Sequence, residues 1–213
     1  MNLRRLLILL LLCTVLPLTA GWLLVPMDPG QPNHLKAYGL AWKVLKEGHR
    51  CRWLLNYRGG SFLLPDHPFT RRTALLLGVR LEDLPAGGYP ALQKHIAAHD
   101  MNDMLLEKAP RLAVYVPPGQ DPWDDAVTLV LEYAAIPYTK VYDQEVLAGK
   151  LDEYDWLHIH HEDFTGQHGK FYGSYRHADW YIRRVDELTR AARAAGYPSV
   201  AAHKLAVART IRR

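Results

Sequence analysis

The chain has 213 residues, of which 49% are apolar, and a formal net charge of +4 at pH 7. This length and composition suffice for one domain of about 150–200 residues or for two smaller ones. Without Arg4 and Arg5 the net charge falls to +2, which is too small and too evenly spread to indicate binding to nucleic acid or to an anionic membrane.

Residues 1–21 predict a secretory signal peptide. Arg4 and Arg5 form a short positive region, Leu6–Val15 is an almost unbroken apolar run, and Pro17 ends it just before several small residues. The run is roughly 10–14 residues long, whereas a membrane-spanning helix needs about 20. We therefore expect an exported protein, periplasmic or extracellular, that is cleaved near residue 20. In the alternative the segment stays as a membrane anchor, extended by the apolar residues Trp22–Val25.

The cysteine count agrees with a fold stabilised by packing. The sequence has two cysteines, and only Cys51 remains after cleavage near residue 20. One cysteine cannot form an internal disulfide, even in an oxidising compartment. We expect Cys51 to be a small buried residue beside a strand, not a reactive thiol.

The first part of the remaining chain alternates between helix and strand signals. Asn33 precedes one helical pattern and Gly48 follows it, while Pro68 and Gly78 bound another. We expect helices over 33–48, 66–78 and 89–108, and strands over 50–56 and 62–64. The segment PAGG at 85–88 is the clearest linker. It predicts an N-terminal α/β segment over 22–88 and a second α/β domain over 89–213.

The second part has a more regular alternation. Asp121 and Ser199 each precede a helical pattern as capping residues do. We expect strands over 111–116, 139–142 and 154–158, and helices over 121–136, 145–150, 178–194 and from 199 onward. Strands separated by helices predict parallel pairing with right-handed crossovers, and therefore an α/β fold with a doubly wound, mostly parallel sheet. Ligands bind at the carboxyl ends of the strands in such sheets.

A polar cluster at the end of the third of these strands is the richest candidate site. It consists of His158, His160, His161, Glu162 and Asp163. Imidazole and carboxylate groups are ligands for zinc or a similar divalent metal, so the three histidines could hold a metal and either acid could serve as general base. Two alternatives remain open: a metal-free cluster that contacts a ligand, and a loop with a purely structural role.

Two further segments are candidates for ligand binding. In Arg58-Gly59-Gly60-Ser61, consecutive glycines expose backbone N–H groups to an anion and the arginine is suited to a carboxylate or phosphate. The alternative is a turn that needs glycine for its backbone geometry. The carboxylates of Asp124 and Asp125 are candidate ligand contacts as well, with helix capping as the alternative.

The stretch PWDDAVTLVLEYAAIPYTKVYDQEVLAGKLDEYDWLHIHH, at residues 122–161, resembles the opening of a class I glutamine amidotransferase-like domain, which has a flavodoxin-like fold. More narrowly, NHLKAYGLAWKVLKEG, WLLNYRGGSFLL and YDWLHIHHEDFTGQHGKFY resemble a family of exported bacterial proteins often labelled asparagine synthetase B. This second resemblance covers nearly all of the chain after the signal segment. It implies a further glycine-rich turn and strand after residue 213, so we expect the amidotransferase-like domain to be incomplete here.

Asparagine synthetase chemistry does not fit the sequence. It requires an N-terminal cysteine nucleophile and a serine- and glycine-rich loop with an acidic residue for ATP, and ATP is scarce outside the cytoplasm. We expect an exported module that binds a small ligand or a partner in the cell envelope. The alternatives are a metal-dependent hydrolase that uses the 158–163 cluster, and a true amidotransferase whose nucleophile lies beyond residue 213.

Overall fold

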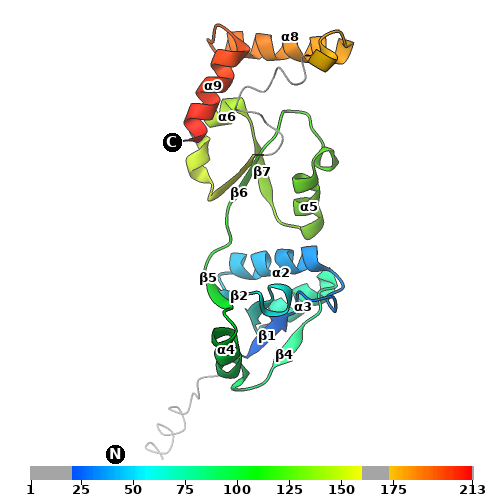
Figure 1. Ribbon diagram of the computed structural model, residues 1–213, viewed down its shortest axis with the longest axis vertical. Coiled ribbons are helices and arrows are strands. Elements are labelled where there is room, and N and C mark those ends of the chain that lie inside the picture. Colours follow the sequence, from blue (N-terminus) through cyan, green and yellow to red (C-terminus); the bar gives the residue numbers. More distant parts are fainter. Residues whose placement is uncertain (1–20, 160–172, 213) are drawn as a thin grey trace, which may run out of the picture. The chain divides into compact units, whose positions relative to one another are not determined.

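The computed structural model describes residues 21–159 and 173–212, and it divides the chain into two compact units (Figure 1). Unit 1 is Met1–Ala109 and unit 2 is Pro110–Arg213. We expected a boundary after residue 88, but residues 89–109 belong to unit 1. The reason is that the last strand of this segment pairs with a strand from the middle of unit 1.

In residues 21–109, unit 1 combines three helices with a five-stranded sheet. Its elements are β1 (Trp22–Val25), α2 (His34–Lys46), β2 (Cys51–Leu55), a 3₁₀ turn (Tyr57–Gly59), β3 (Phe62–Pro65), α3 (Pro68–Leu77), β4 (Glu82–Leu84), α4 (Gly88–Ala98) and β5 (Asn102–Leu106). The strand order is β4-β1-β3-β2-β5.

Every strand pair of this sheet is antiparallel, so the expectation of mostly parallel pairing is wrong for unit 1. The six-residue connection from Leu55 to Phe62 accounts for the β2–β3 pair. Parallel neighbours need a crossover of a dozen or more residues, whereas a short turn joins antiparallel ones.

The predicted long helix over 89–108 is also wrong. Helix α4 ends at Ala98, and β5 follows and pairs with β2 from Cys51↔Leu106 to Leu55↔Asn102. Asp100 makes the reversal with φ of 52°, a left-handed conformation that glycine usually supplies at the end of a helix.

Helix α2 has the predicted limits but a different buried face. The Asn33 side chain accepts a hydrogen bond from the backbone N–H of Lys36 at 3.1 Å, as an N-cap does. Helical spacing predicts a core-facing stripe of Leu35, Tyr38, Trp42 and Leu45, but Leu35 and Tyr38 are 40% and 42% exposed. Leu45 is buried as expected, and the buried face also includes Ala37, Leu40, Ala41 and Val44.

Alternate residues of the central strands enter two cores on opposite faces of the sheet. Val25 and Leu64 pack in the core that includes α2 and α3, whereas Leu24 and Leu63 pack in the core that includes α4 (Figure 1). Neighbouring residues of a strand point to opposite faces, so the sheet is covered on both sides.

Unit 2 contains a three-stranded parallel sheet. Its elements are β6 (Leu112–Tyr115), a 3₁₀ turn (Pro122–Asp124), α5 (Ala126–Ala134), β7 (Tyr138–Val141), α6 (Asp143–Leu147), a 3₁₀ turn (Lys150–Glu153), β8 (Trp156–Ile159), α8 (Asp179–Ala194) and α9 (Val200–Ile211). The order is β7-β6-β8, and both pairs are parallel, as the sequence predicted for this part of the chain.

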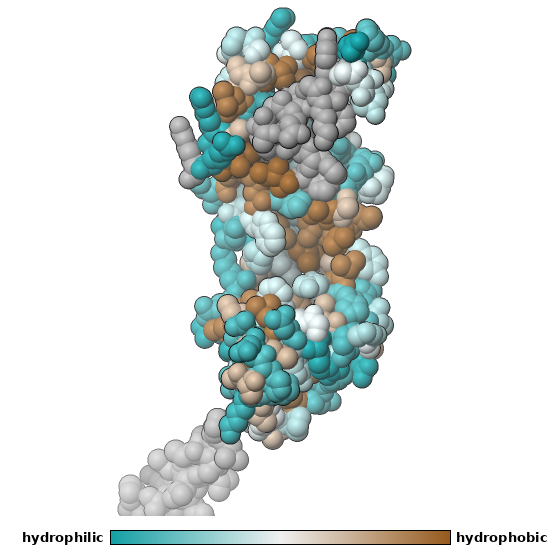
Figure 2. Space-filling model, viewed as in Figure 1, coloured by the Kyte–Doolittle hydropathy of each residue, from teal (hydrophilic) through white to brown (hydrophobic). Residues whose placement is uncertain are grey.

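One face of this sheet has a well-formed core. Ala113 and Tyr115 of β6 pack there with Val146 of α6 and Val207 of α9. Figure 2 shows hydrophobic surface over α5, where Leu129 and other large apolar residues are exposed. Among residues 21–159 and 173–212, no helix is long and apolar enough to cross a bilayer.

Candidate functional site

The turn at Arg58–Ser61 is held entirely by groups of unit 1. The Arg58 Nε donates to Asp28 Oδ2 at 2.6 Å, and its two terminal nitrogens donate to the Glu82 carboxylate at 2.6 and 3.0 Å. These hydrogen bonds hold the pKa values of both carboxyls below their ordinary range. A guanidinium with two internal carboxylates is poorly placed to bind an anionic ligand.

The rest of the turn is packed against the segment after β1. A Cβ on Gly59 would lie 2.3 Å from the carbonyl oxygen of Met27, and Gly59 has φ of +82°. The Ser61 side chain is fully buried and accepts a hydrogen bond from the backbone N–H of Met27 at 3.3 Å. Gly60 accepts a hydrogen bond at its carbonyl from the Trp53 indole at 3.0 Å. These contacts support the structural alternative for the turn.

The acidic residues after β6 cap helices. Asp124 accepts a hydrogen bond from the backbone N–H of Asp121 at 2.9 Å. Asp125 accepts from the backbone N–H groups of Val127 and Thr128, at 2.7 and 3.4 Å, at the start of α5. The helix predicted to begin at Asp121 thus starts as a 3₁₀ turn, and α5 begins only after Asp125. Both side chains have the capping role.

Only one member of the predicted metal cluster lies in the described part of the chain. His158 is on β8 and pairs in register with Val114 of β6. His160, His161, Glu162 and Asp163 lie outside the described residues. Within the described ranges, no three His, Cys, Asp or Glu residues are grouped as metal ligands would be.

A buried polar cluster that the sequence reading missed lies at the carboxyl ends of β6 and β7. The Lys204 ammonium donates to the hydroxyls of Tyr115 and Tyr142, both at 3.0 Å, and to Asp143 Oδ1 at 3.1 Å. The Tyr115 hydroxyl also donates to Asp143. His203 Nδ1 lies 3.7 Å from the other oxygen of Asp143. Apart from Tyr142, which is half-buried, all of these residues are buried.

The local sequence explains how this cluster forms. Tyr115 ends β6, and Tyr142 and Asp143 immediately follow β7, so parallel pairing brings them to one edge of the sheet. Lys204 falls on the apolar stripe of α9 with Val207 and Ile211, and this misplaced charge was the signal that could have revealed it.

The hydrogen bonds of the cluster connect α9 and α6 to the carboxyl ends of β6 and β7. An ammonium group has three donors, and the two phenols and the carboxylate supply three acceptors. The ammonium also lies 4.4 Å from the centroid of the Tyr142 ring, which adds a cation–π contact. The cluster therefore supports the edge of the sheet and is not itself an open site.

Cys51 is the described cysteine, and its surroundings agree with the expectation of a structural residue. Its side chain is fully buried in the core with α2 and α3. Burial raises the pKa of the thiol to about 12, so the thiolate that a nucleophile needs is scarce at neutral pH.

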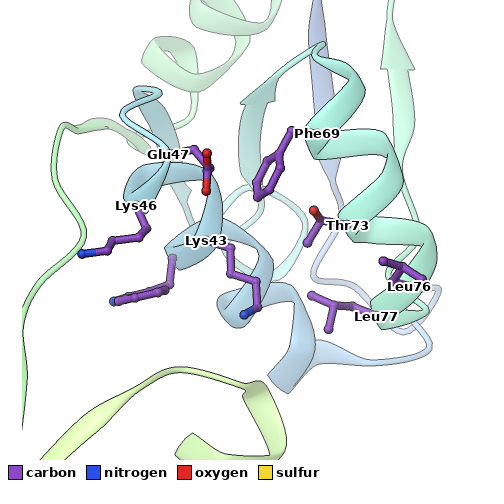
Figure 3. Close-up of a pocket in the computed structure, with 8 residues that line it drawn as sticks. Lys43, Lys46, Glu47, Phe69, Thr73, Leu76 and Leu77 are labelled. Carbon is purple, nitrogen blue, oxygen red and sulfur yellow. The ribbon is translucent and has the colours of Figure 1, made fainter.

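A groove lies on unit 1 between α2 and α3, with a volume of about 410 Å³. Figure 3 shows its lining. The lining residues are Trp42, Lys43, Lys46, Glu47, Phe69, Thr73, Leu76 and Leu77. No sequence signal singled out this groove, because its residues come from two helices whose packing is set by the tertiary fold.

Comparison of the chain with models of protein families, with curated proteins and with solved structures gave no match.

Proposed function

We propose that unit 2 is the opening part of a doubly wound, class I glutamine amidotransferase-like domain in an exported protein. It binds a small ligand or a cell-envelope partner at the carboxyl ends of β6 and β8, without asparagine synthetase chemistry. The strand order β7-β6-β8 carries this proposal. In chain order the strands are arranged second, first, third, which is how flavodoxin-like sheets begin.

The strand order also supports a location for the proposed ligand site. In such sheets the crevice opens outside the carboxyl ends of the strands, at the point where the order reverses. Here the chain moves from β6 to β7 on one side and then to β8 on the other, so this point lies between β6 and β8. The loop 116–121 follows β6, and residues 160–163, which include the predicted polar cluster, come directly after β8.

Features of the described residues agree with this arrangement. Lys204 and its partners fix two helices at the neighbouring strand ends, which gives a crevice a rigid wall. Strand β8 is at the edge of the sheet, and its Trp156 and Ile159 are 61% and 38% exposed. A further strand beside β8, with its covering helix, would bury such residues, as the amidotransferase-like fold requires.

The absence of asparagine synthetase chemistry is supported by unit 1. The glycine turn that would have to bind phosphate is occupied by its own arginine and two carboxylates. The buried Cys51 is unsuited to release ammonia from glutamine, because its pKa is raised to about 12.

Hydrogen exchange tests the location of the site. The full-length protein is incubated with each free L-amino acid in turn, glutamine and asparagine included, because the resemblance implies an amino-acid amide. We expect a bound amino acid to slow exchange in 116–121 and 157–159, with no change in unit 1 and no release of ammonia from glutamine. Protection confined to other segments contradicts the proposed location of the site, and no protection with any amino acid contradicts an amino-acid ligand.

Two other readouts address the enzyme alternatives. Release of ammonia from glutamine would show that the protein is a true amidotransferase and not a binding module. Stoichiometric zinc that is lost in the H158A/H160A double variant would favour the metal-dependent hydrolase over the binding module. Elemental analysis of protein purified without chelator measures the zinc, and protein free of zinc excludes the zinc hydrolase.

A further inference from the structure

The groove between α2 and α3 has an apolar floor and a charged margin. Trp42, Phe69 and Leu77 are partly buried and pack against the core of unit 1. Leu76 lines the groove and is 74% exposed. Figure 3 shows Phe69, Thr73 and Leu77 along α3, facing the α2 side chains. The floor therefore offers apolar surface that continues the hydrophobic core into solvent.

Two lysines of α2 also line the groove, and in Figure 3 the Lys43 side chain extends toward Leu77 while the Lys46 side chain extends away from it. Lys43 and Lys46 are three residues apart, so they lie on the same face of α2. Within the described ranges, the structure gives neither ammonium group a carboxylate partner in an ion pair. Glu47 contributes one carboxylate to the margin, so the lining residues carry one net positive charge. This charge favours an anionic group at the margin of the groove.

The size of the groove indicates a small molecule. Its volume of about 410 Å³ falls within the roughly 300–1,000 Å³ of typical ligand pockets. Eight residues line it, whereas a stable protein–protein interface uses about 20–30 residues on each side. A concave surface between two helices also suits one chain-like ligand better than the plane of a bilayer.

We propose that this groove binds a fatty carboxylate with an acyl chain of about the length of dodecanoate. The acyl chain lies on Phe69, Leu76 and Leu77, and the carboxylate is held by Lys43 with support from Lys46. The groove belongs to unit 1 alone, so its test is independent of the site proposed at the strand ends of unit 2.

Calorimetric titration of the full-length protein with octanoate, decanoate and dodecanoate, each below its micelle concentration, tests the acyl contact. A fully buried methylene contributes about 0.8 kcal/mol, so Kd should fall with each two methylenes, by at most about 15-fold, until the groove is filled. A Kd that does not change with chain length overturns the proposal. Binding to phosphatidylglycerol vesicles without binding to the free acids also overturns it, because the occupant would then be a membrane surface. A dimer of the protein that excludes dodecanoate overturns it as well, because a second copy would then occupy the groove.

Matched variants test the residues. Leu75 and Leu76 are neighbours on α3 and are 81% and 74% exposed, but only Leu76 lines the groove. We expect L76N to weaken dodecanoate binding at least tenfold and L75N to leave it within twofold. Circular dichroism melting verifies that both variants fold. Equal effects of the two substitutions overturn the proposal.

A separate pair of variants tests the contact between the two lysines and the carboxylate. We expect the K43M/K46M double variant to lose the preference for dodecanoate over dodecanol, and K94M, which changes an exposed lysine of α4, to keep it. An unchanged preference in K43M/K46M removes the two lysines from the site and overturns the proposal.

Discussion

Replacing Lys204 by methionine tests whether the buried cluster fastens α9 to the parallel sheet. Methionine keeps most of the apolar volume and removes the charge. Lys204 and Asp143 are 7% and 5% exposed, so the change leaves a carboxylate in the interior without its cation. Loss of one partner of a buried ion pair costs about 3–5 kcal/mol. We expect about 3 kcal/mol, because Asp143 keeps the hydrogen bond from Tyr115 and the nearby ring of His203.

Urea unfolding followed by hydrogen exchange measures this cost within unit 2. The amides of Val207 and Ala208 in α9 are buried and report the local free energy of opening. The K150M variant is the control, because Lys150 is exposed and its loss should change stability by less than about 0.5 kcal/mol. The D143N/K204M double variant should be more stable than the sum of the single changes predicts, because it removes both charges together.

A cost below about 1 kcal/mol for K204M would refute this reasoning. It would mean that the ammonium, the two phenols and the carboxylate contribute no more than an exposed ion pair does. Strict additivity of K204M and D143N would refute it as well, since residues that share hydrogen bonds must couple.

Three other predictions concern unit 1. G59A should destabilise the protein by more than about 2 kcal/mol, whereas G78A should cost only about 1 kcal/mol. Both glycines have positive φ, but only at Gly59 would an added Cβ collide with backbone atoms. Equal melting temperatures of the two variants would contradict this prediction. The stability difference between wild type and R58M should be constant above about pH 5 and should narrow in acid. The pKa values of Asp28 and Glu82 are lowered in the folded protein, so the two ion pairs stabilise it fully at pH values above the ordinary pKa values of 3.8 and 4.5. This stabilisation is lost as the pH falls through the lowered pKa values. Urea unfolding at a series of acidic pH values measures the difference, and a difference that widens as the pH falls would contradict this prediction. Cys51 should react with Ellman's reagent at pH 8 only after unfolding in urea, because it is fully buried and its pKa is raised to about 12; rapid reaction of the native thiol would contradict this.

Capping residues, prolines and glycines predicted the helix ends correctly where these neighbouring residues alone determine the backbone conformation. Helix α3 begins with Pro68 and ends at Gly78 in the left-handed conformation, and Ser199 caps α9 through the N–H of Ala202, all as the sequence indicated. These features depend on a few neighbouring residues. The end of α4 lacks a glycine and uses Asp100 instead, so the same signals predicted that this helix continues into what is strand β5.

Non-local pairing was beyond these signals. Strand β5 is defined by its register with β2, about 50 positions earlier in the chain, and no local pattern carries that information. The same holds for the side chains. The turn at Arg58 was identified as a turn, but Asp28 and Glu82, which occupy its guanidinium, come from distant segments. Lys204 is recognisable only as a charge on an apolar helix face, and its partners become evident once β6 and β7 are paired.

Strand β1 bears on the choice between a cleaved signal and a retained anchor. The sequence left Trp22–Val25 as an apolar extension of an anchor. In unit 1 these residues form β1, paired on one side with β3 and on the other with β4, and Leu23 and Val25 are fully buried. The backbone N–H of Asp66 donates to the carbonyl of Gly21 at 2.7 Å, so the fold already includes Gly21.

Residues of a central strand cannot also lie in a bilayer. The apolar segment left for an anchor is therefore 6–20, or 15 residues, against the roughly 20 that a spanning helix needs. This shortfall supports the proposal of export with cleavage near residue 20. Thiol counting in urea tests it on protein recovered from a bacterial host. One thiol per chain means that Cys13 has been removed with the signal, and two thiols per chain would contradict cleavage.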